Sequence, residues 1–343
     1  MVDDIVLYDE QQMVTKCSIV CVCLTFSLLY VLMHYISCFF QIDLLHPFAS
    51  LEWSECKELP VGMTDAQAVW LEDKIYMGGG DTSGRRNDAR LYIYAPTTDT
   101  WTVMDTAVYW FALTIYHSQL VLVGGREYVG LGALGLDTNK LWTLDERDEL
   151  QETLPPMRVR RYGVSAASHG DHLLVAGGGG DGSQLDIVEV YSDHIWSSAQ
   201  PLPQPFADMK STVLSGHWYL MGGFRQGTEV YCASLDSLVA GCQPSETSQT
   251  SSVWKRLPDV HNTRFTPSSF GNRLTAIGGQ QRLPMSSIQA FSPRLWSWVD
   301  VGNLPVVGCR VCTVVLPSGE LIVMGGFLNN TRFNKVYKAT LKG

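Results

Sequence analysis

The sequence predicts an all-β fold, a six-bladed β-propeller, from three observations. First, short apolar runs end abruptly in glycine pairs, as in "KIYMGGGD" and "LIVMGGF". Second, this feature recurs at intervals of 45 to 56 residues, and a repeat of this period is typical of modular architectures. The runs of glycine begin at Gly78, Gly124, Gly177, Gly222, Gly278 and Gly325. Third, the segment before the first repeat matches an element that the last repeat lacks.

Each repeat reads as four short strands. A polar turn between two apolar runs precedes every glycine pair, which indicates a β-hairpin. The six predicted turns are Glu72-Asp73, His117-Ser118, Gly170-Asp171, Ser215-Gly216, Gly271-Asn272 and Ser318-Gly319. A polar loop and a third strand follow the glycines. A fourth strand then carries a tryptophan in most repeats, with Tyr94 and Trp101 in the first repeat and Phe291 and Trp298 in the fifth, whereas the second repeat has Gln151 in its place.

A single four-stranded sheet cannot bury both of its faces, so we expect the repeats to pack side by side around an axis. Glycine is then expected where neighbouring blades crowd the backbone, and the aromatic residues are expected between the blades.

The combination of an apolar run, a double glycine and a spaced tyrosine and tryptophan resembles the kelch repeat, whose period is about 50 residues. The resemblance covers residues 51–343 and implies a kelch-type propeller. The sixth repeat ends without its tryptophan strand, and residues 51–60, "LEWSECKELP" with Trp53, match it. An N-terminal strand is therefore expected to close the last blade. An insert at Ala233–Ser252 in the fourth repeat reads as a surface loop, because it is rich in Ser, Thr and Gln.

The N-terminal region predicts a different element. Residues 17–40 carry no formal charge, and about 20 apolar residues suffice for a transmembrane helix. The expected organisation is a tail at residues 1–16, a transmembrane helix at 17–40, a linker at 41–50 and the propeller at 51–343. Single-pass membrane localisation follows, with the side of the propeller left open. The alternative is a cytoplasmic protein.

Bulk composition excludes some classes of function. The net charge of -9 and pI near 5.3 argue against a nucleic-acid partner, because phosphate binding requires a basic surface. The nine cysteines form neither a disulfide framework nor a paired zinc motif. No metal and no cofactor are expected.

The arginines are unevenly distributed over the expected propeller. Eleven of the sixteen fall on the face formed by the loops between second and third strands and by the connections between blades. Arginine clusters suit carboxylates. Arg161, Arg264 and Arg310 begin first strands 14 to 16 residues before their glycine pairs, at positions comparable with Thr64, Trp110 and Asp208. The expected partner-binding residues are Arg161, Arg264, Arg310, Tyr109, Trp110, Arg126, Arg225, Arg282 and Arg332.

Such a ring of arginines and aromatics resembles the peptide pocket of kelch adaptors that recruit acidic segments to ubiquitin ligases. The expected function is non-catalytic binding of an acidic protein segment. One alternative is the recognition part of such an adaptor without its BTB domain. Another is a divergent carbohydrate-active enzyme, although no sialidase Asp box and no copper-ligand set is present. Alternatively, the arginines have a structural role and form ion pairs with acids of the same chain, such as Asp81 or Asp208.

Overall fold

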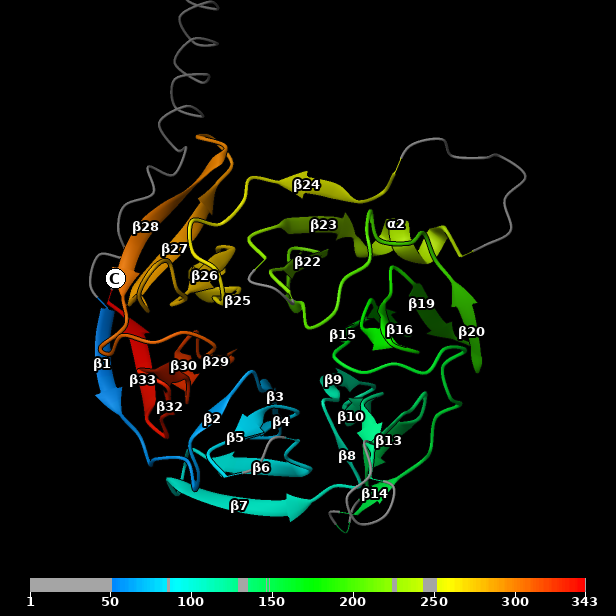
Figure 1. Cartoon of the computed structure of the whole chain (residues 1–343), viewed down its shortest axis with the longest axis horizontal. Helices are drawn as coiled ribbons and strands as arrows, with labels where there is room; N and C mark the ends of the chain where they lie inside the picture. Colours follow the sequence, from blue (N-terminus) through cyan, green and yellow to red (C-terminus); the bar gives the residue numbers. More distant parts are fainter. Residues whose placement is uncertain are drawn as a thin grey trace, which may run out of the picture. The chain divides into compact units, whose positions relative to one another are not determined.

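The structure is a computed structural model that describes residues 51–84, 87–128, 135–145, 147, 149–223, 227–242 and 252–342. These residues lie within the compact unit Pro47–Gly343. They form six four-stranded antiparallel sheets, arranged as a ring with the first strand of each sheet innermost (Figure 1). This confirms the predicted all-β propeller of six blades.

Blade one consists of β3 (Gln67–Leu71), β4 (Lys74–Gly78), β6 (Arg90–Ala95) and β7 (Thr100–Asp105), and blade two of β9 (Ala112–Tyr116), β10 (Gln119–Val123), β13 (Leu141–Leu144) and β14 (Leu150–Gln151). Blade three consists of β15 (Ser165–His169), β16 (His172–Ala176), β19 (Val188–Ser192) and β20 (Ile195–Ser198), and blade four of β21 (Lys210–Leu214), β22 (His217–Met221), β23 (Val230–Ser234) and β24 (Lys255–Leu257). Blade five consists of β25 (Thr266–Ser268), β26 (Thr275–Ile277), β27 (Ser287–Ser292) and β28 (Ser297–Asn303), with the 3₁₀-helix η1 (Phe270–Asn272) between its first two strands.

Blade six is closed by the N-terminal strand, as the sequence predicts. It consists of β29 (Cys312–Val315), β30 (Leu321–Met324), β33 (Val336–Leu341) and β1 (Leu51–Glu55). Strand β1 pairs antiparallel with β33, with Trp53 opposite Ala339. The two ends of the propeller are therefore held together by main-chain hydrogen bonds.

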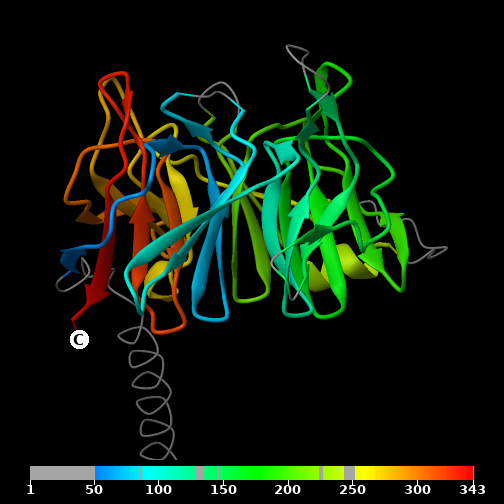
Figure 2. The same ribbon diagram turned by 90° about the horizontal axis from the view of Figure 1, so that it is seen from below.

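Short accessory strands extend one face of the ring. They are β2 (Met63–Thr64) with β5 (Asp81–Thr82), β8 (Val108–Tyr109) with β11 (Arg126–Glu127) and β12 (Leu136–Asp137), β17 (Gly179–Gly180) with β18 (Ser183–Gln184), and β31 (Phe327–Leu328) with β32 (Thr331–Arg332). Figure 2 shows these strands at one end of the blades and the tight turns of the inner hairpins at the other. Below, the end with the accessory strands is called the accessory face.

Crowding between blades explains the glycine pairs. A Cβ on Gly325, whose φ is +58°, would lie 2.4 Å from the carbonyl oxygen of Met63 in the next blade. The N–H of the following Gly326 donates to that same oxygen at 2.8 Å. A side chain would thus push apart the seam that this hydrogen bond closes, which confirms the expected close approach of the blades.

The tryptophans also join successive blades. Trp101 stacks on Tyr94, with ring centroids 4.8 Å apart, and its indole N–H donates to the carbonyl of Lys57. Trp196 and Trp298 donate in the same way to Pro155 and Pro258, each at 2.8 Å. Each indole therefore ties a fourth strand to the chain that enters its blade.

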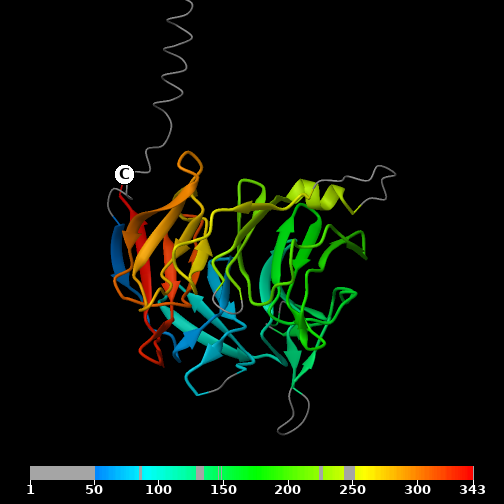
Figure 3. The ribbon, with the colours of Figure 1, turned by 45° about the horizontal axis from the view of Figure 1, so that its top comes forward.

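The insert in blade four departs from the expected surface loop. Residues Leu235–Ala240 form helix α2, capped by the Ser234 side chain. Leu235 and Leu238 are buried in a cluster with Trp218 and Trp254, and the helix lies at the rim of the ring (Figure 3). The insert therefore adds to the core, whereas its residues 243–251 lie outside the described ranges.

The predicted transmembrane helix is corrected. Across the described ranges, no helix is long and apolar enough to cross a membrane. Residues 17–40, on which the prediction rested, lie outside those ranges, as do the tail at 1–16 and the linker at 41–50. The uncharged run shows that the segment is hydrophobic, but hydrophobicity alone does not establish a membrane-spanning helix. The predicted transmembrane helix and membrane localisation are therefore both withdrawn.

Candidate functional site

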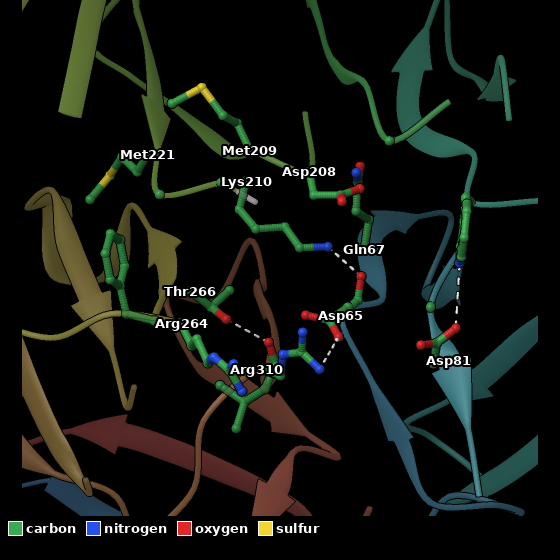
Figure 4. A pocket seen from close by; sticks show the side chains of 18 of the residues that line it. Asp65, Gln67, Asp81, Asp208, Met209, Lys210, Met221, Arg264, Thr266 and Arg310 are labelled. Atoms are coloured by element: carbon green, nitrogen blue, oxygen red, sulfur yellow. Dashed lines mark hydrogen bonds and ion pairs between the residues drawn. The ribbon is translucent and has the colours of Figure 1, made fainter. Parts of the chain in front are cut away.

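A central cavity of about 400 Å³ opens on the accessory face. The cavity lies among the residues that precede the first strand of each blade and the glycines that follow the second strand. Figure 4 shows its charged side chains, with Arg264 and Arg310 on one side, Asp208 on the other and Lys210 between them. Its size fits one or two ligand side chains rather than a folded domain.

One residue of each blade forms a ring around the cavity, here called the ring position. Each of the six has a left-handed backbone, with φ between 55° and 60°. Several neighbouring members are joined by main-chain hydrogen bonds, such as Arg310 N–H to the Arg264 carbonyl at 2.9 Å and Asp208 N–H to the Gly163 carbonyl at 2.9 Å. The ring positions are Asp65, Trp110, Gly163, Asp208, Arg264 and Arg310.

Two of the three predicted ring arginines line the cavity. The Arg310 guanidinium lies 3.3 Å from a carboxylate oxygen of Asp65. Lys210, two residues after Asp208, donates to the main-chain carbonyl of Asp65. Arg264 lines the cavity without an ion pair or side-chain hydrogen bond to any residue in the described ranges.

Arg161 lies elsewhere, which corrects its expected position at the mouth. Its side chain is fully buried and pairs with Glu189, itself buried. It also donates to the carbonyls of Gly177 and Ile187 at 3.2 and 2.9 Å. Burial lowers the pKa of Arg161, opposed by the charge of Glu189. A ligand cannot reach this group, whose role is to hold the third blade together.

The structural role of Arg161 is supported by its counterpart in blade five. Asn262 also lies two residues before a ring position, and its amide donates to the carbonyl of Gly278 at 3.0 Å. Gly177 and Gly278 are the first glycines of their pairs. Arginine and asparagine thus perform the same bonding at equivalent places, in two blades of the same chain.

Tyr109, Trp110 and Arg126 form an aromatic cluster beside the cavity. The Arg126 guanidinium lies 4.1 Å from the centroid of the Tyr162 ring and donates to Asp137 at 2.6 Å. Tyr109 is buried, and its hydroxyl accepts from the N–H of Gly135 at 3.1 Å. Of the three predicted residues, Trp110 alone borders the cavity.

The remaining predicted arginines are dispersed. Arg332 lies 3.5 Å from Asp81, a cavity residue, so this arginine is paired with one of the acids considered from the sequence. Arg282 is exposed and does not line the cavity. Arg225 lies outside the described ranges.

Sequence reasoning considered Asp81 and Asp208 only as partners of the arginines and did not name Asp65, so it missed the acids as part of the binding site. Asp65, Asp81 and Asp208 line the cavity together with Lys210 and Gln67. The ring position keeps a nearly constant spacing from the glycine pair, once the backbone angles show which glycine of each pair is left-handed. It lies 14 residues before the first left-handed glycine of the pair in five blades and 15 before it in the sixth. By that spacing Gly163, and not Arg161, is the ring residue of blade three.

Asp208 is the most perturbed acid of the site. Its side chain is exposed where it borders the cavity, but the cavity walls displace most bulk water around it. This desolvation is the largest cause that raises its pKa to about 6. The negative charges of Asp65 and Asp81 also raise the pKa, while Lys210 and Arg310 lower it.

Asp208→Asn is expected to stabilise the fold at neutral pH. An acid whose folded-state pKa exceeds its unfolded value of 3.8 destabilises the fold when ionised, and this cost disappears as the pH falls. The full shift corresponds to about 3 kcal/mol, and solvent screening of the exposed side chain reduces this to roughly 1 kcal/mol. Asparagine also tolerates the left-handed backbone. Urea unfolding at pH 7.5 and pH 4 measures the difference, which should shrink toward pH 4. A variant less stable than wild type at pH 7.5 contradicts the assignment.

The sequence comparisons with known proteins match kelch proteins. A model of the Kelch motif matches residues 160–203. Kelch-like protein 36 of Mus musculus is 25% identical over 62% of this chain, and that of Bos taurus is 26% identical over 64%. Kelch-like protein terF of Aspergillus terreus is 21% identical over 80% of the chain.

The aligned region spans about a third of the length of the two Kelch-like protein 36 relatives, 34% and 37%. The solved structure of YjhT superposes with a TM-score of 0.65, at 13% identity, over 84% of this chain and 99% of its own. That likeness establishes the fold. The glycine and tryptophan spacing, the six closed blades and these matches together support a kelch-repeat protein.

Proposed function

We propose that this propeller is a non-catalytic interaction module that binds an acidic segment of a partner protein at the central cavity. The relatives named above support a protein-interaction propeller in general. The finer proposal depends on Arg264. Arg161, Arg126, Arg310 and Arg332 are all paired with acids of this chain, whereas Arg264 borders the cavity with no such partner in the described ranges.

Arg264 has the chemistry to hold a ligand carboxylate. Its guanidinium offers several donors in one plane, and a charge-assisted hydrogen bond to a carboxylate contributes about 1.5–3 kcal/mol. Arg310 beside it keeps the local potential positive even though Asp65 partly neutralises it. A partner's Asp or Glu side chain is thus expected to bind Arg264 directly.

A second candidate is that the propeller serves as the recognition part of a longer adaptor. The observation in its favour is that the Kelch-like protein 36 relatives extend well beyond the region they share with this chain. Both candidates use the same cavity, so the same binding experiment tests the site in either setting.

Selection of displayed random dodecapeptides on the immobilised full chain tests the proposal. Enriched peptides are expected to contain Asp or Glu. Their affinity should fall about tenfold or more for Arg264→Asn, in which asparagine suits the left-handed backbone. Arg294→Asn is the matched control, because Arg294 is exposed in the turn between β27 and β28. Enrichment without acidic residues, or equal binding by the Arg264 variant, contradicts the proposed function.

A further inference from the structure

The cavity contains two oppositely charged side chains that form no ion pair with any residue in the described ranges. Arg264 is one of them. Asp208 is the other, because its carboxylate has no hydrogen bond or ion pair with any residue in the described ranges, although Lys210 lies two residues away. The Lys210 ammonium donates instead to the main-chain carbonyl of Asp65.

The two charges belong to neighbouring ring positions but point apart. An ideal Cβ on Gly163 would lie 2.2 Å from the Asp208 carboxylate, so this carboxylate leans over blade three. Arg264 lies on the side of blades five and six, beside Arg310 (Figure 4). Glycine at the third ring position leaves the space that this orientation of Asp208 requires.

The cavity is therefore polarised. Arg264 and Arg310 make the side of blades five and six positive, and Asp208 and Asp81 make the opposite side negative. Asp81 accepts from the Trp110 indole at 3.4 Å and pairs with Arg332, so its charge is partly satisfied. Asp208 is the acid left for a ligand.

We propose that the cavity recognises a partner segment that presents an amine together with a carboxylate, with the carboxylate on Arg264 and a lysine ammonium on Asp208. The proposal rests on the proposed function and specifies its ligand. An acidic segment alone would satisfy Arg264 but bring a second negative charge toward the uncompensated Asp208. A lysine in the same segment removes that repulsion and supplies the missing partner of Asp208.

An ammonium fits this half of the cavity better than a metal ion. Hard divalent cations require about six oxygen ligands, whereas Asp208 is the single unpaired carboxylate that the described residues place here. Arg310 and Lys210 also act on Asp208 electrostatically and would repel a doubly charged ion. A single ammonium with three donors requires one such acceptor.

Capped peptides on an array test this inference. Glu and Lys are placed one to four residues apart in an alanine and tyrosine background, and each peptide has two partners in which Lys or Glu is replaced by Gln. Fluorescence polarisation then measures the dissociation constants of the best set. For the wild-type full chain, replacing Lys by Gln should weaken binding about tenfold.

The variants assign each charge to its residue. Asp208→Asn should remove the preference for Lys over Gln while the preference for Glu remains, and Arg264→Asn should do the reverse. Asp193→Asn is the control, because Asp193 also has a left-handed backbone, with φ of 49°, but lies in the turn between β19 and β20. If Glu matters and Lys does not, this inference is wrong and the proposed function stands. If neither matters, both fail.

Discussion

Arg161→Met is expected to lower the free energy of unfolding by about 3–5 kcal/mol, because removing one member of a buried ion pair leaves the other charge uncompensated. The uncompensated group is Glu189, which is almost fully buried and whose other contact is the N–H of Arg158 at 2.9 Å. The carbonyls of Gly177 and Ile187 also lose their donor. Urea unfolding followed by tryptophan fluorescence measures the loss.

Two further variants separate this effect from binding. The double variant Arg161→Met with Glu189→Leu should recover much of the lost stability, since an apolar pair of similar volume can replace a buried ion pair. Arg264→Asn should unfold within about 0.5 kcal/mol of wild type, because Arg264 makes no ion pair in the described ranges. A loss below about 1 kcal/mol for Arg161→Met would show that the buried pair is not holding the third blade.

Arg161 and Gly163 show which features of the fold and the cavity could be predicted from the sequence and which could not. Glycine pairs follow from backbone contacts that recur at every seam, and the tryptophans follow from contacts that most blades share, so their spacing predicts the sheets and the closure by β1. Whether an arginine faces the cavity depends on a shift of two residues, which spacings of 14 to 16 residues do not resolve. The constant φ of the ring position resolves it, because it marks Gly163 as the equivalent of Arg264.

Ion pairs between the first and last blades are harder to predict than the blades themselves. Arg310 pairs with Asp65, and Arg332 pairs with Asp81, across the seam where the ring closes. Each pair joins residues about 250 positions apart, so only the closed ring brings them together. The helix α2 was missed for a different reason. The polar composition of its insert masks Leu235 and Leu238, whose spacing of three places both on one helical face.

Ser54→Pro is expected to open the sixth blade and to cost about 3 kcal/mol, lowering the melting temperature by about 5–10 °C. The N–H of Cys56 donates to the carbonyl of Val336 at 3.0 Å. In an antiparallel pair such bonds recur every second residue, so the N–H of Ser54 faces Lys338, which lies opposite it. Proline removes this donor, and no other strand of the described residues pairs with β33 on that side.

The effect should be specific to the ladder between β1 and β33. Ser54→Ala keeps the N–H and is expected to unfold within about 0.5 kcal/mol of wild type. Opening of the blade also releases the Lys57 carbonyl that accepts from the Trp101 indole, so the proline variant should shift tryptophan fluorescence before global unfolding. Proline tolerated as well as alanine would mean that β1 is not required to close the propeller. The cavity between Asp65 and Arg310, which meet across this same seam, would then have to be held together by side chains alone.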